Sequence, residues 1–223
     1  TLADRFGSAD YDVAKPAALA LPAEKNSGGR FDDVTHLLEY KVKAKGKFAP
    51  QIDVHTLNQC SDAFLTVKKP VSILVPTAKS LQSPVDAPIE ANHQLDHFLC
   101  YQAKPESKLA NGTALPKFPK GVQVNIVDQF RTSRRYDVKA ITKLCAPAAK
   151  SGSPFFLKGE KKGQSAPIAQ TSIRHADSFL ACYKVKLASA EIPQLGCGPL
   201  DPKNKGTKLD PKQAKTATPP GIF

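Results

Sequence analysis

Two kinds of segment recur along this chain, and their order constrains the fold more than any other feature. The first kind, here called the front half, is centred on a tyrosine and has the copies Leu37–Lys43, Phe98–Lys104 and Leu180–Lys186. The second kind, the back half, carries a proline near its end and has the copies Tyr11–Lys25, Leu65–Lys79 and Tyr136–Lys150. Along the chain the order is back, front–back, front–back, front. Because a repeat needs its partner to bury its apolar face, we expect the two outer halves to complete one core together.

The residue pattern within the repeats is typical of strands. Val122–Val127 alternates apolar and polar side chains, Asp128–Phe130 is a polar turn, and Arg135–Val138 resumes the alternation. The chain also has 19 prolines and no methionine or tryptophan, which favours short strands joined by turns. We therefore predict an all-β protein of tandem small sandwich- or barrel-like units, one of them split between the two termini.

The repeat boundaries divide the chain into five parts. The predicted parts are an N-terminal half-repeat at 1–30, a first complete unit at 31–90, a second complete unit at 91–165, a C-terminal half-repeat at 166–200 and an extended tail at 201–223.

Five cysteines allow pairings to be predicted from the repeat. Cys100 and Cys145 stand where the other complete unit has Glu39 and Leu74, so both thiols are missing together there, which indicates a Cys100–Cys145 disulfide. Cys182 is at the same front-half position as Cys100, and its back-half counterpart is Ala20. We expect Cys182 to bond Cys197 instead, and a Cys60–Cys197 bond between subunits is the competing pairing. Disulfides indicate an oxidising compartment, so we expect an extracellular or cell-surface protein.

No motif for catalysis stands out in the sequence. Nucleophile-elbow and phosphate-loop patterns are absent, and His36 and His97 share a repeat position, which favours a structural role. We predict that the protein is not an enzyme and has no catalytic, cofactor-binding or metal-binding residues and no cofactor. A hydrolase whose carboxylates assemble only in space is the enzymatic alternative.

Charge and hydropathy limit the partners of the chain. The formal net charge is +12, which predicts a solvated surface or, as the sharper alternative, non-specific attraction to acidic polysaccharide or extracellular DNA. No apolar run approaches the roughly 20 residues of a membrane helix, so no membrane span is expected.

Four motifs together resemble a known kind of domain. They are Phe98-Leu99-Cys100-Tyr101, Asp128-Gln129-Phe130, Tyr136-Asp137-Val138 and Leu144-Cys145-Ala146-Pro147. With them, the chain from Thr1 to about Lys186 resembles a little-characterised family of bacterial secreted repeat domains. The resemblance implies an exported β-rich module and supplies no active site.

From the unmatched halves we predict a secreted structural protein that polymerises head to tail into an extracellular filament. The C-terminal half-repeat of one subunit would add a strand to the N-terminal half-repeat of the next. The alternative is a monomeric extracellular adhesion or polyanion-binding module whose ends close on each other. The predicted interface residues are Leu2, Phe6, Tyr11, Val13, Leu19, Leu21, Phe179, Leu180, Cys182, Tyr183, Val185, Ile222 and Phe223.

Overall fold

The structure, a computed structural model, is built from β-strands. It describes residues 1–30, 32–58, 60–80, 85, 88, 95–118, 120–152, 172–191 and 207–208, and none of these residues is helical. The strands are β1 (Leu2–Asp4), β2 (Gly7–Ala9), β3 (Tyr11–Ala20), β4 (Ala23–Lys25), β5 (His36–Ala44), β6 (Gln51–Asn58), β7 (Ser61–Thr77), β8 (Phe98–Pro105), β9 (Gln123–Asp128), β10 (Arg131–Pro147), β11 (Ala149–Lys150), β12 (Leu180–Leu187), β13 (Ala190–Glu191) and β14 (Thr207–Lys208).

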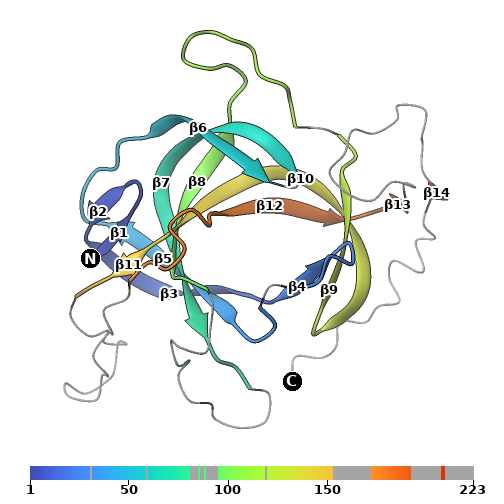
Figure 1. The fold of residues 1–223 in the computed structure, drawn as a ribbon, viewed down its shortest axis with the longest axis horizontal. Coiled ribbons are helices and arrows are strands. Elements are labelled where there is room, and N and C mark those ends of the chain that lie inside the picture. Colours follow the sequence, from blue (N-terminus) through green and yellow to red (C-terminus); the bar gives the residue numbers. More distant parts are fainter. Residues whose placement is uncertain are drawn as a thin grey trace.

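Most of these strands belong to one antiparallel sheet of nine strands. Its main path is β3-β5-β7-β8-β10-β9-β4, with β12 attached to β10 and β6 attached to β7. The two ends of this path, β3 and β4, are separated in the chain only by Leu21 and Pro22. The sheet must therefore curve back on itself, and Figure 1 shows the resulting barrel-like ring.

The pairing between front and back strands has the same register in all three copies. Each front tyrosine lies opposite the bend of a long back strand, in the pairs Tyr40–Pro16, Tyr101–Pro70 and Tyr183–Ile141. Irregularities in the ladder flank each bend. The inserted residues bend the back strand and increase its twist. Each back strand therefore follows the curve of the sheet.

The hairpin turns also repeat, through the same side-chain hydrogen bond. The carboxylates of Asp4 and Asp128 each accept from the backbone N–H two residues later, at 2.8 Å, and the amide oxygen of Asn58 does the same. These are Asx turns, which Asp and Asn form because the short side chain reaches its own backbone.

The tyrosines of the front strands then bind these turns. The Tyr101 hydroxyl donates to Asp4 at 2.7 Å, and the Tyr183 hydroxyl donates to Asn58 at 3.1 Å. Each tyrosine also packs beside a phenylalanine at an equivalent position, in the pairs Tyr101–Phe48 and Tyr183–Phe118. Tyr101 is only 1% exposed, and the main core forms on the face of the sheet to which its ring belongs.

The prediction of an all-β fold is confirmed, and so is the Cys100–Cys145 disulfide. The strands of the two complete repeats are joined in one sheet, because β8 pairs with β7 on one edge and with β10 on the other. The predicted division into separate small units, with one unit split, stays a prediction. The described part of the chain contains no helix with the length and apolarity that crossing a membrane requires.

We predict that the disulfide contributes much of the stability. Its sulfurs join residues 45 positions apart, and closing a loop of that length removes chain entropy worth about 4 kcal/mol from the unfolded state. The Cys100→Ser/Cys145→Ser variant should therefore lose about that free energy of unfolding in denaturant titrations. The Cys182→Ser variant, which keeps the bond, is the control. A double variant as stable as the wild type would contradict the prediction.

Candidate assembly edges

Among the residues that the structure describes, the front strand β12 has a strand partner on one edge only. Its counterparts have two: β5 lies between β3 and β7, and β8 lies between β7 and β10. Among the described residues, β12 pairs with β10 alone, through Leu180–Leu187. The other edge of β12 therefore presents backbone N–H and C=O groups that no described strand receives.

The back strand β3 has no described strand partner on the complementary edge. In β7 the last residues pair with the preceding front strand, from Thr77 opposite His36 to Ser72 opposite Lys41, and in β10 they pair with β8 in the same way. The equivalent part of β3 pairs with β5 on one side and with no described strand on the other. Its side chains are exposed from Ala14 to Ala20, and Leu19 is 41% exposed. The two unpaired edges are thus complementary in type.

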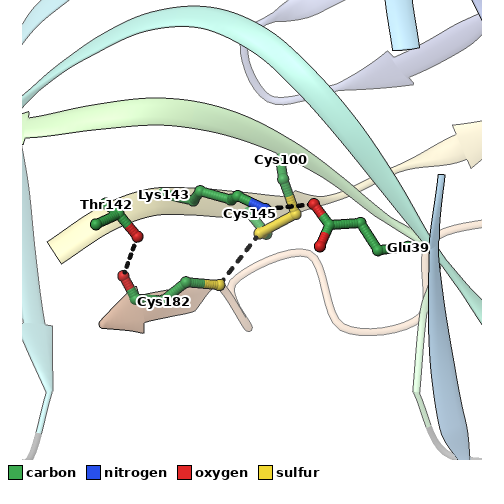
Figure 2. Close-up of a disulfide and its surroundings, with 6 residues drawn as sticks. All are labelled: Glu39, Cys100, Thr142, Lys143, Cys145 and Cys182. Atoms are coloured by element: carbon green, nitrogen blue, oxygen red, sulfur yellow. Dashed lines mark hydrogen bonds and ion pairs between the residues drawn. A yellow bond between two sulfur atoms is a disulfide. The ribbon is translucent and has the colours of Figure 1, made fainter. Parts of the chain in front are cut away.

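A cluster of sulfur atoms lies beside the β12 edge (Figure 2). The Cys182 Sγ is 3.8 Å from the Cys145 Sγ, which is itself bonded to Cys100. The backbone carbonyl of Cys182 accepts a hydrogen bond from the Thr142 hydroxyl at 3.2 Å. These contacts hold β12 against β10 and direct the Cys182 side chain toward the disulfide.

An ion pair spans the same cluster. The Lys143 ammonium of β10 donates to the Glu39 carboxylate of β5, and both side chains are partly shielded from water. Burial raises the pKa of Glu39, but the hydrogen bond from Lys143 opposes it and the net pKa lies below the ordinary value. Glu39 stands at the front-half position that is cysteine in β8 and β12. Its register neighbour in the first complete repeat, at the place of Cys145, is Leu74, so the ion pair instead links Glu39 of the first repeat to β10 of the second.

The structure corrects one predicted disulfide. Cys182 carries a free thiol, so the predicted Cys182–Cys197 bond is wrong. Cys60 is disulfide-bonded, and Cys197 lies outside the described residues. The physical reason is the direction of the Cys182 side chain, which points into the sheet toward Cys145. Sequence reasoning matched Cys182 to a thiol nearby in the chain and did not foresee this long-range placement.

Several predicted interface residues lie within the core of a single chain. Leu2 is 5% exposed, and the Phe6 ring lies 5.0 Å from Tyr101 and 6.2 Å from Phe179. Arg5 also pairs with Asp177 at 3.1 Å. The N-terminal hairpin and the segment before β12 therefore meet inside one molecule.

The other predicted interface residues fall on the two edge strands or beyond the described chain. Val13 and Leu19 lie on β3, whereas Leu180, Cys182, Tyr183 and Val185 lie on β12. Tyr11 begins β3 and packs against the main core, and Leu21 follows the strand. Ile222 and Phe223 lie outside the described residues. Within the part of the chain that is described, no group of three His, Cys, Asp or Glu side chains can hold a metal ion.

The N-terminal hairpin is fixed by the partly buried carboxyl group of Asp4, which predicts a pH effect. Burial raises the pKa of Asp4 above its ordinary value of 3.8, against the opposing hydrogen bond from Tyr101. The folded state thus holds the Asp4 proton more tightly than the unfolded chain. The associated stability is full below the unfolded pKa and is lost as the pH rises through the folded pKa.

Asp4→Asn keeps an oxygen for Tyr101 but removes this titration. We expect the free energy of unfolding of the wild type, relative to that of Asp4→Asn, to fall between acidic and neutral pH. Denaturant titrations of both proteins across that range would measure the fall. An unchanged difference would show that the Asp4 pKa is the same in the folded and unfolded states.

The thiol of Cys182 gives a direct chemical test. Burial raises the pKa of Cys182, and the nearby charge of Lys143 opposes the rise only partly. Since the thiolate is the reactive form, iodoacetamide should label the folded protein slowly at neutral pH and faster in alkali. After unfolding without reductant, mass spectrometry should find the label on Cys182. Label on Cys100 or Cys145 would contradict the assigned bonding.

Comparisons of the chain with protein-family models, with curated proteins and with solved structures give no match. The geometry of these two edges and the register that the other strands share are therefore the features that bear on function.

Proposed function

We propose that the protein is a secreted structural subunit that polymerises head to tail. In this proposal, the free edge of β12 in one molecule adds to the free edge of β3 in the next. Strand addition of this kind supplies main-chain hydrogen bonds and places alternate side chains in the partner's core. The observation that carries the proposal is that two strand edges have no partner among the described strands, and that each edge would accept a strand of the other's type.

The shared register specifies the residues that would pair across the joint. Tyr40 lies opposite Ile73 and Tyr101 lies opposite Leu144. The equivalent pair across the joint is Tyr183 opposite Leu19, which brings Cys182 opposite Ala20. Exposed Leu19 would then be covered, which favours association through burial of apolar area.

The tyrosine hydrogen bonds support the same continuation. Tyr101 reaches back two turns to Asp4, and Tyr183 reaches back two turns to Asn58. If the same rule held across a joint between two molecules, Tyr40 of the following molecule would reach the turn at Asp128 of the preceding one.

The geometry of the joint would determine the form of the assembly. The surfaces on β12 and β3 differ, so the contact is heterologous, and a heterologous contact that does not close into a ring grows into a fibre. Pairing would also remove two open strand edges, which are otherwise sites of uncontrolled aggregation. A disulfide is compatible with the extracellular location that this role requires.

A closed monomer is the second candidate, and one observation favours it. Phe6 and Arg5 already contact Phe179 and Asp177 in the same chain. If β12 and β3 closed on each other there, the product would be a compact extracellular adhesion or polyanion-binding module.

An engineered disulfide distinguishes these candidates. Ala20→Cys places a thiol opposite Cys182 in the predicted register, as Cys145 is opposite Cys100 in the native pair. Under mild oxidation, head-to-tail assembly should give a ladder of covalent oligomers on a non-reducing gel, and the ladder should collapse on reduction. Negative-stain microscopy of the wild type should show threads.

Two variants control for chance oxidation. Ala20→Cys/Cys182→Ser removes one thiol of the pair, and Ala17→Cys shifts the new thiol out of register; neither should form the ladder. A monomer that loses both thiols would support the closed form instead. A monomer that retains both thiols, together with compact single particles, would overturn both candidates.

A further inference from the structure

A groove with a basic rim lies between the neighbouring strands β5 and β7. It encloses about 580 Å³, and its lining includes lysines from both strands together with an apolar floor. The groove is built from one chain, so the inference drawn from it does not depend on polymerisation.

The positive charge of the groove is largely uncompensated. Lys143 is paired with Glu39, the one carboxylate in the lining. The other lining lysines, Lys41, Lys43 and Lys69, are exposed and form no ion pair with any carboxylate of the described residues. Three ammonium groups around one concave surface raise the local concentration of anions.

The floor of the groove is apolar and firmly held. It is formed in part by Val42, Val71 and Phe48, and the Phe48 ring packs on buried Tyr101 at 5.0 Å. Apolar floors with a few charged groups at the rim are the usual form of a small-molecule or oligomer site. The ligand that fits such a surface has apolar faces and several negative charges at its edges.

We propose that this groove binds an acidic polysaccharide through its carboxylated sugar units. The C–H faces of the sugar rings would lie on the floor, and the carboxylates would reach the three lysines. Single-stranded nucleic acid is a poorer fit, since it requires aromatic rings that are open for base stacking, whereas Phe48 is engaged by Tyr101.

The repeat extends the same charge along the sheet. Lys43, Lys104 and Lys186 each lie three residues after the tyrosine of a front strand, and all three are exposed. A linear polymer with regularly spaced carboxylates would meet equivalent lysines on successive front strands. A single small anion would gain nothing from that spacing.

Binding of polygalacturonate by the full chain tests the proposal, with neutral dextran as the uncharged probe. The triple variant Lys41→Gln/Lys43→Gln/Lys69→Gln should lose on the order of tenfold affinity or more at low salt. Its affinity should also depend less steeply on salt concentration, since it releases fewer counterions. Dextran should bind neither protein.

A matched variant distinguishes binding at the groove from attraction to the overall charge of the protein. Lys108→Gln/Lys117→Gln/Lys120→Gln removes the same charge from exposed lysines between β8 and β9, and it should bind almost as well as the wild type. Equal losses in both triple variants would overturn the proposal in favour of non-specific attraction. Tighter, groove-dependent binding of single-stranded DNA at matched charge would overturn it in favour of a nucleic-acid site. Filament formation is scored separately by microscopy. Neither binding result therefore bears on the proposal of polymerisation.

Discussion

The structure depends on the sharing of its inner strands between neighbours along both edges. The front strands β5 and β8 are each hydrogen-bonded to the back strand before and to the back strand after, so neither complete repeat completes its backbone pairing alone. The curvature of the sheet follows, because each back strand bends at the same place opposite a tyrosine. The location of the two free edges follows as well, because β12 and β3 each lack one of the two described strand partners that the inner strands have. Local strand propensity is secondary to this constraint.

Much of the strand arrangement could be predicted from the sequence. Alternation predicts the strands at Val122–Val127 and Arg135–Val138, and comparison of the two complete repeats predicts the Cys100–Cys145 pair. These signals are local, or are repeated at equal spacing, and both kinds can be read without knowing the fold. The sequence also predicts the turn at Asp128 as polar, whereas the tyrosine hydrogen bonds to the equivalent turns at Asp4 and Asn58 leave no local signal.

The remaining features depend on how the sheet curves, which no local pattern records. The ion pair between Glu39 and Lys143 joins residues 104 positions apart, and neither residue signals the other in the sequence. The contact of Phe6 with Phe179 spans nearly the whole described chain, so residues expected at a joint between molecules lie inside one. Cys182 was assigned to the wrong partner for the same reason: its side chain is directed by β10 rather than by its neighbours in sequence. The groove between β5 and β7 likewise gathers lysines that are scattered in the sequence.

The prolines at two of the bends have a consequence for fidelity. Pro16 and Pro70 each lie opposite a front tyrosine, and neither can donate a backbone hydrogen bond there. A strand displaced by one residue would set the missing donor against a carbonyl that needs one, and would turn every side chain to the opposite face. Proline at these bends thus disfavours a misaligned neighbour, and it helps a chain of similar segments to pair in the correct order.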